Sequence, residues 1–260
     1  MNINDMIKPT GKKLLMTHLV AGFPTERQSL KLAKLLVKSG ADILEVQIPF
    51  SDPIADGEAI VGACHQSIRN GFTALKIFNF IKKLRKLDVP IVVMTYANIP
   101  FKIGIDKFVR ALNLSGASGL IVPDLPFDSE EAKKFFDRCR EQKINLIQVI
   151  SPGIYKTRLV EAVKMSEGFI YCTTRKGTTG KHFGKEEGIK YFLRSVRQIS
   201  DKPIALGFGI STPKDIKILK KQADILIIGS AIVKMVSNPG GLNKVSGFIK
   251  SIRRELDSRK

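Results

Sequence analysis

The feature that most constrains this chain is an alternation, repeated eight times, between a short run of apolar residues and an amphipathic stretch. Each apolar run is rich in β-branched residues and almost continuously hydrophobic, which is typical of a strand in a parallel sheet covered by helices. In the stretches between the runs, apolar residues recur at three- and four-residue spacing, and a Ser, Thr or Asp opens the segment, as at the start of an amphipathic helix. The expected strands lie at residues 14–22, 42–50, 90–98, 119–124, 145–151, 169–174, 203–209 and 224–230.

Eight β–α units in a chain of 260 residues predict the α/β class and a single (β/α)8 TIM barrel, with residues 1–260 forming one domain. No low-complexity linker interrupts the series, and a hydrophobic content of 43% is enough for one large core. A doubly wound open sheet is the alternative, but it would leave the first and last strands unpaired. In a barrel the active site lies at the C-terminal ends of the strands, so the residues that end each apolar run are the candidates for chemistry.

The charge and the cysteine pattern narrow the possible partners. A net charge of +19 favours an anionic ligand, but the basic residues are spread over the polar faces of the expected helices, without the aromatic-interleaved stripe of a nucleic-acid binder. We therefore expect no nucleic-acid partner, and modest help in binding a phosphate ester. The three cysteines are widely spaced and form no CxxC pair, which argues against a zinc site or a disulfide framework and for a reducing compartment.

The chain also lacks the marks of a membrane or secreted protein. No apolar run approaches the roughly 20 residues that a transmembrane helix needs. The start of the chain has neither the apolar core nor the small-residue cleavage site of a secretory signal. These features predict a cytoplasmic protein without a membrane partner.

Glu45 attracts attention because the run around it, 42–50, is otherwise apolar enough to be a buried strand. A charged group in such a run is costly unless it is paired, neutralised or placed at the mouth of the strand. The barrel offers that place, near its upper rim, and Asp56 follows in the loop at the same end. Each carboxylate has a structural alternative, Glu45 as a satisfied core residue and Asp56 as a turn residue before Gly57.

Glycines at the ends of the last strands indicate an anion site. Gly209 ends the seventh run, Gly229 ends the eighth, and Ser230 opens the helix that follows. Glycine lets backbone N–H groups approach an anion, and a helix N-terminus adds a partial positive charge. The loops after strands seven and eight commonly bind phosphate in this barrel. Gly180, in the loop after the sixth run, is placed to add another N–H group.

Six motifs at these strand ends carry a resemblance to a known family. Together they resemble the α subunit of tryptophan synthase, and the similarity covers nearly the whole chain. The PFSDP-x-ADG string is the most specific of the six. The motifs are LE-x-x-IPFSDPIADG at 44–57, YAN at 96–98, VPDLP at 122–126, R-x-G-x-TG at 175–180, GFGIS at 207–211 and GSAIVK at 229–234.

The resemblance implies a lyase of tryptophan biosynthesis that cleaves indole-3-glycerol phosphate, by a retro-aldol reaction, to indole and glyceraldehyde 3-phosphate. It also implies that this chain needs no metal and no cofactor, and that a β subunit holding pyridoxal phosphate receives the indole through a tunnel in an αββα heterotetramer. A stand-alone lyase that releases indole and a weakly active regulatory subunit are the alternatives. Retention of Glu45, Asp56 and the glycines argues against the regulatory subunit, because a scaffold needs none of them.

By the same resemblance, three residues form the catalytic group. Glu45 handles the proton at C3 of the indole ring and the proton of the side-chain hydroxyl. Asp56 faces the indole N–H and stabilises the charge that builds there, and Tyr171 lies beside the substrate and both carboxylates. The residues expected to bind the phosphate are Gly180, Gly209, Gly229 and Ser230.

The resemblance assigns two further roles outside this group. Arg175 and Thr179 belong to the loop after the sixth strand, which acts as a lid that excludes water. Asp52 lies in the loop that faces the β subunit and is expected to couple the two chains.

Four residues depart from the family pattern and put the shape of the indole pocket in question. His18 stands where Phe or Tyr is usual, although a lone strand histidine is more often a packed core residue than a catalyst. Gln47 replaces a glycine two positions past Glu45, on the same face of the strand. Glu58 replaces a proline, where its charge could raise the pKa of the nearby aspartate. Gln148 puts an amide into the fifth strand, near the apolar pocket wall.

Overall fold

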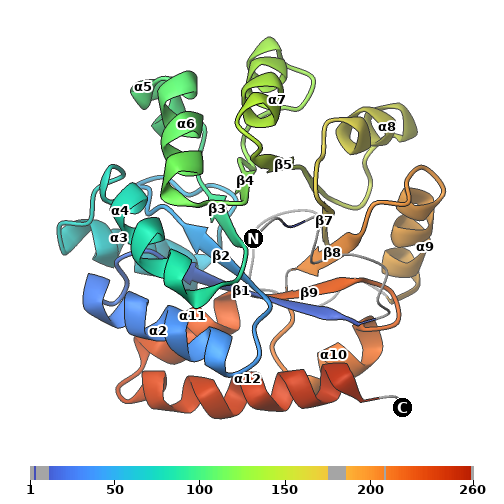
Figure 1. Ribbon diagram of the computed structural model, residues 1–260. Helices are drawn as coiled ribbons and strands as arrows, with labels where there is room; N and C mark the ends of the chain where they lie inside the picture. Colours follow the sequence, from blue (N-terminus) through green and yellow to red (C-terminus); the bar gives the residue numbers. More distant parts are fainter. Residues whose placement is uncertain (1–2, 4–11, 175–185, 208, 259–260) are drawn as a thin grey trace.

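The computed structural model describes residues 3, 12–174, 186–207 and 209–258. Its strands form a ring at the centre of the molecule, and the helices surround that ring on the outside (Figure 1). Three residues with expected roles, Arg175, Thr179 and Gly180, lie outside the described residues. Within the part of the chain that the structure describes, no helix is long and apolar enough to cross a membrane.

Every apolar run of the sequence contains a strand, as predicted. All neighbouring strands pair in parallel, in the order β5-β4-β3-β2-β1-β9-β8-β7-β6. The strands are β1 (Leu14–Val20), β2 (Ile43–Gln47), β3 (Ile91–Met94), β4 (Gly119–Ile121), β5 (Asn145–Ile147), β6 (Val149–Ile150), β7 (Ile170–Thr173), β8 (Ile204–Gly207) and β9 (Ile225–Ile228).

The sheet closes at Gln148, the single residue between β5 and β6. Because β5 pairs with β4 and β6 pairs with β7, the two ends of the strand order are joined by the chain itself. The backbone N–H of Gln148 donates to Ser166 Oγ (3.1 Å), and its carbonyl oxygen accepts from the Tyr171 N–H (3.1 Å). The predicted fifth strand is therefore interrupted by one residue. The (β/α)8 barrel is confirmed, and the open sheet is excluded.

The helices lie between successive strands along the chain and cover the ring, as Figure 1 shows. Thr25, Ser129 and Thr212 cap α2, α7 and α10, each accepting a backbone N–H of the first turn through its side chain. The described elements are α2 (Glu26–Lys38), α3 (Glu58–Arg69), α4 (Lys76–Leu84), the short 3₁₀ helix η1 (Arg85–Leu87), α5 (Asn98–Ile103), α6 (Ile105–Ser115), α7 (Glu130–Glu141), α8 (Lys156–Lys164), α9 (Glu186–Arg197), α10 (Pro213–Leu219), α11 (Ser230–Ser237) and α12 (Gly241–Asp257).

The alternation of side chains along each strand creates two apolar layers. The larger layer lies between strands and helices, and the smaller one fills the inside of the barrel. In β1 the inner face carries Met16 and then His18. In β2 it carries Ile43, followed by Glu45 and Gln47 toward the C-terminal end. The inner face of these strands thus changes from apolar to polar at the end where the barrel fold places its active site.

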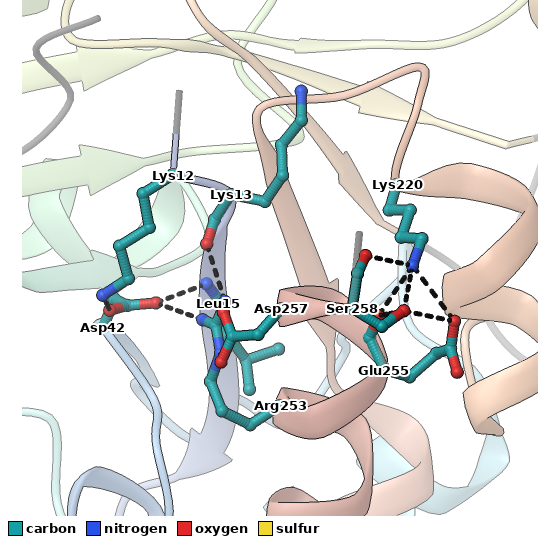
Figure 2. A network of polar contacts seen from close by, with 9 residues as sticks. All are labelled: Lys12, Lys13, Leu15, Asp42, Lys220, Arg253, Glu255, Asp257 and Ser258. Carbon is teal, nitrogen blue, oxygen red and sulfur yellow. Dashed lines mark hydrogen bonds and ion pairs between the residues drawn. The ribbon is translucent and has the colours of Figure 1, made fainter. Parts of the chain in front are cut away.

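The C-terminal helix α12 is fastened to the other end of the barrel (Figure 2). Asp42, just before β2, accepts hydrogen bonds from the Leu15 N–H (2.8 Å) and from the guanidinium of Arg253 on α12 (2.9 Å). The same carboxylate accepts from Lys12 Nζ (2.8 Å), and the guanidinium also donates to the carbonyl oxygen of Lys13 (3.0 Å). These contacts sit at the N-terminal ends of the strands, so they support the barrel from the end opposite the candidate site.

Candidate active site

The inner faces of β1 and β2 place His18 opposite Glu45. The two residues are direct partners in the parallel register. His18 Nδ1 lies 3.4 Å from Glu45 Oε1, and each side chain is only 6% exposed. The remaining polar atoms of the pair, His18 Nε2 and Glu45 Oε2, have no hydrogen-bond partner among the described residues. The site therefore contains a buried acid–base pair with one unsatisfied polar atom on each member.

The surroundings of His18 favour its charged form. Burial opposes the imidazolium, but the carboxylate of Glu45 and a hydrogen bond to it outweigh that effect, with further contributions from Asp56 and Gln47. The pKa of His18 is therefore raised above its ordinary value of 6.5. The residue is buried, as expected of a strand histidine, but it also lines the candidate pocket.

Asp56 is held by two donors that come from different strands. Gln47 Nε2, at the end of β2, and Tyr96 Oη, after β3, both donate to Asp56 Oδ2, each at 2.7 Å. Tyr96 is itself fixed by stacking on Phe50, with 5.3 Å between ring centroids, and by accepting the Ala55 N–H (3.2 Å). The sequence marked Tyr96 only as a polar strand end, and its YAN motif was the signal for this supporting role.

Burial is also the main influence on Asp56. It raises the pKa of this carboxyl above the ordinary value of 3.8, against the opposing effects of the His18 charge and of the hydrogen bonds from Tyr96 and Gln47. The sequence predicts a raised pKa for this aspartate, but it points to the wrong cause, the charge of Glu58. Glu58 is exposed in the first turn of α3, and burial is the largest contribution.

Tyr171 of β7 lies on the inner face of the barrel, close to the carboxylates. Burial, followed by the charges of Glu45 and Asp56, raises the pKa of its phenol well above 10.0, so the hydroxyl stays protonated. Its partner in the register of β7 and β8 is Ala205, and its hydroxyl reaches Gly207 at the end of β8. A Cβ atom at position 207 would lie 2.5 Å from the Tyr171 hydroxyl, so only glycine leaves room for this side chain.

The expected phosphate-binding residues that the structure describes line the same pocket as the carboxylates. Gly229 is the N-cap of α11, which begins at Ser230, so backbone N–H groups of the first helical turn point toward this end of the pocket. Gly209 has a φ of +83°, a left-handed conformation that favours glycine.

This pocket has an empty volume of about 630 Å³, which includes its open mouth. Its lining combines polar groups, the carboxylates and the glycine-rich helix start, with apolar side chains. The lining residues are His18, Glu45, Ala55, Asp56, Ile60, Met94, Ile121, Pro123, Val149, Tyr171, Gly209, Ile210, Ile227, Gly229 and Ser230.

Two other predicted positions lie away from this pocket. Asp52 is exposed in the loop after β2, where it accepts a hydrogen bond from Ser51 Oγ (2.8 Å), so it is free to meet a partner rather than a substrate. Gln148 is buried at the break between β5 and β6 and does not line the pocket, whose wall there is formed by Val149. Across the described ranges, no three His, Cys, Asp or Glu side chains gather in a way that could hold a metal ion.

Comparisons with known proteins agree in both sequence and structure. The family model described as tryptophan synthase alpha chain matches residues 5–255. The tryptophan synthase alpha chain of Desulforapulum autotrophicum is 38% identical over 240 residues, covering 92% of this chain and 94% of the relative. That of Petrotoga mobilis is 37% identical over 257 residues, covering 96% and 98%.

Two solved structures show the same architecture over almost the full length. A tryptophan synthase structure from Mycobacterium tuberculosis superposes with a TM-score of 0.90 at 28% identity, covering 98% of this chain and 97% of that one. The tryptophan synthase alpha chain of Legionella pneumophila subsp. pneumophila gives a TM-score of 0.87 at 27% identity, covering 99% and 98%.

Proposed function

This chain belongs to the tryptophan synthase alpha chain family, and we propose that Glu45 and Asp56 are the residues that carry out its reaction. The protein is a lyase that cleaves indole-3-glycerol phosphate to indole and glyceraldehyde 3-phosphate. The observation that carries the residue assignment is the pocket itself. The buried carboxylate of Glu45, the half-buried carboxylate of Asp56 and a glycine-rich helix start line one cavity at the C-terminal mouth of the barrel.

Glu45 supplies the acid–base chemistry. Cleavage requires that C3 of the indole ring gains a proton, that the adjacent side-chain hydroxyl loses one, and that the carbon–carbon bond between ring and side chain breaks. The electrons of the broken bond return to the ring, and the hydroxyl carbon becomes the aldehyde of the product. A single carboxyl that first gives and then receives a proton balances these steps. Glu45 suits this task because Oε2 is the atom left without a partner among the described residues.

Asp56 supplies electrostatic stabilisation. When C3 is protonated, positive charge builds on the ring N–H, and a fixed carboxylate facing that group lowers the energy of the charged intermediate. Gln47 and Tyr96 both bind Oδ2, so they orient the carboxylate in advance and leave Oδ1 as the oxygen to meet the substrate. Tyr171 packs beside the ring as a neutral phenol.

The phosphate of the substrate binds at the glycine-rich end of the pocket. Backbone N–H groups of Gly209, Gly229 and Ser230 donate hydrogen bonds to it, with the Ser230 hydroxyl as a further donor and the N-terminus of α11 as a partial positive charge. Gly180 adds an N–H group from the loop after β7. Arg175 and Thr179 of that loop serve as a lid, by the family resemblance alone.

Family membership implies a β subunit as partner. We further propose that the assembly is an αββα heterotetramer in the cytoplasm, that residues 1–260 form one domain, and that exposed Asp52 couples the two kinds of subunit. Pyridoxal phosphate belongs to the β subunit in this proposal, and this chain works without a cofactor of its own. The basic surface contacts neither nucleic acid nor membrane.

The decisive experiment measures indole release from indole-3-glycerol phosphate by the wild type and by Glu45→Gln, with and without a β subunit. We expect the substitution to lower kcat at least about 100-fold, because it removes general acid–base catalysis. Binding of glycerol 3-phosphate should persist, because the phosphate end is untouched. Glu58→Gln, which removes an exposed carboxylate from the first turn of α3, is the matched control.

Each result separates the possible roles. Full activity of Glu45→Gln would overturn the assignment of the acid–base residue. Activity of the wild type that does not change when a β subunit is added would favour the stand-alone lyase. Absence of cleavage in every arm, with stimulation of the β subunit, would favour the regulatory alternative.

A further inference from the structure

Glu45, the acid–base residue of the proposed reaction, is paired with a histidine on the neighbouring strand. His18 faces Glu45 across the β1–β2 pair, with Nδ1 3.4 Å from Oε1. Gly229, where α11 begins, lies beside the same residue, because an added Cβ at Gly229 would lie 3.4 Å from His18 Cβ and 3.6 Å from Cγ. His18 thus lies between the strand that carries the acid–base carboxyl and the start of α11.

Charge burial explains why such a pair is stable. A lone carboxylate buried to the extent of Glu45 is costly, and an imidazolium at contact distance compensates for that cost. The two residues are therefore placed to share one proton. Either arrangement of that proton, on His18 or on Glu45, keeps Nδ1 and Oε1 in contact, 3.4 Å apart.

The proposed reaction consumes no proton overall. Glu45 gives one proton to C3, and the hydroxyl of the substrate returns one. A pair that holds a single proton can pass it from the imidazolium to the Glu45 carboxylate, deliver it to carbon, take the hydroxyl proton onto the carboxylate and restore the imidazolium. No exchange with solvent is needed, which matters because both side chains are almost entirely buried.

The other groups facing the pair do not compete for this role. From the loop after β2 comes Asp56, whose carboxylate adds to the effect that favours the imidazolium. From β7 comes Tyr171, which stays protonated. On the other side, β9 and the start of α11 contribute Ile227, Gly229 and Ser230 to the pocket, none of which titrates near neutrality.

We propose that His18 is the positioning residue of Glu45 and stores the proton that Glu45 delivers to the substrate. The inference rests on the proposed function, since it assigns the partner of its acid–base residue.

The test compares the dependence of kcat/KM on pH for the wild type, His18→Phe and His18→Asn. Phe removes both the contact and the stored proton, whereas Asn keeps a donor close to the position of Nδ1 but cannot store a proton. We expect the high-pH limb of the profile to move down by about one pH unit or more in both variants, because the stored proton then has no imidazole to hold it and a carboxyl ordinarily releases its proton at lower pH than an imidazolium does. His65→Asn is the matched control, because His65 is exposed and bonds only the backbone oxygen of Ser51 in the described structure.

A second measurement does not depend on activity. The ring nitrogens of His18, followed by nitrogen NMR, should titrate above the ordinary histidine value in the wild type and at lower pH in Glu45→Gln, because the opposing carboxylate is gone. This arm remains available if a substitution at position 18 prevents folding.

The outcomes distinguish this inference from the function on which it rests. An active Glu45→Gln variant would overturn the proposed function. An inactive Glu45→Gln variant with an unmoved high-pH limb in either position-18 variant would overturn the role of His18 alone. A His18 titration that is the same in the wild type and in Glu45→Gln would overturn it as well.

Discussion

At the scale of single residues, the two carboxylates proposed for catalysis are each held by side chains of other segments. The carboxylate of Asp56 accepts hydrogen bonds from Gln47 at the end of β2 and from Tyr96 after β3. Glu45 is paired with His18 on the neighbouring strand. Gln47 and His18 are two of the positions at which this sequence departs from the family resemblance.

The raised pKa of Asp56 predicts that its ionised carboxylate lowers the free energy of unfolding at neutral pH. Because the folded state holds this proton more tightly than the unfolded state, the contribution of Asp56 to the free energy of unfolding falls as pH rises from the unfolded value through the folded one. We therefore expect Asp56→Asn to raise the midpoint of thermal unfolding at neutral pH, by about 2 °C in a chain of this size, while cleavage activity is lost.

Thermal scans of both proteins at neutral and at mildly acidic pH check this expectation. The difference in unfolding midpoint between the Asn variant and the wild type should shrink as pH falls from the folded to the unfolded pKa of Asp56, because the wild-type carboxyl then becomes neutral too. An Asn variant less stable than the wild type at neutral pH would show that the hydrogen bonds from Gln47 and Tyr96 outweigh the cost of burial.

At the scale of elements, the pairing of β7 with β8 makes a place for Tyr171. The two strands run in parallel with Tyr171 opposite Ala205 and Thr173 opposite Gly207. The tyrosine hydroxyl thus reaches along the inner face to the end of β8, where the absence of a side chain at position 207 accommodates it. Position 207 therefore requires glycine because a side chain there would have no room, and not because its backbone conformation is unusual.

Gly207→Ala tests this spatial requirement. The new Cβ would lie 2.5 Å from the Tyr171 hydroxyl, so the phenol must move, and we expect kcat/KM to fall at least about 10-fold as the pocket is rearranged. Gly62→Ala is the matched control. Gly62 lies in the interior of α3 with open space around its Cβ position, and the same substitution there should stabilise the fold by about 1 kcal/mol. Unchanged kinetics in Gly207→Ala would contradict the requirement.

At the scale of the whole molecule, the chain secures its closure with charges at the end remote from the site. Arg253 on α12 joins Asp42 at the start of β2, and both side chains are only 14% exposed. Lys220, after α10, binds Glu255 and Ser258 at the end of the same helix, as Figure 2 shows. The last helix thus ties together the first strands and the last β–α units of the ring.

Asp42→Ala should destabilise the protein by about 2 kcal/mol, because it removes the largely buried carboxylate that accepts from the backbone of β1 and from Arg253, and leaves the guanidinium with only the more exposed carboxylate of Asp257. Kinetic constants should be unaffected at temperatures where the variant is folded, since the contact lies at the opposite end of the barrel. Urea unfolding measures the change. Asp106→Ala, which breaks an exposed pair with Arg138, is the control and should cost less than about 1 kcal/mol. Equal losses in the two variants would contradict the role of α12.

The sequence by itself determined the barrel and the main residues of its pocket. The alternation of apolar runs and amphipathic stretches specifies strands and helices because burial follows the period of each element. Glu45 and the glycines were visible as a carboxylate in an apolar run and as glycines at successive strand ends, whereas Asp56 was assigned by the family resemblance.

Only the tertiary structure decided which residues support that chemistry. The pairing of His18 with Glu45 depends on the register of β1 against β2, and the two donors to Asp56 come from separate strands. The break at Gln148 depends on Ser166, far along the chain. Such contacts join residues that are distant in sequence, so no local pattern encodes them, and they exist only once the ring of strands has closed.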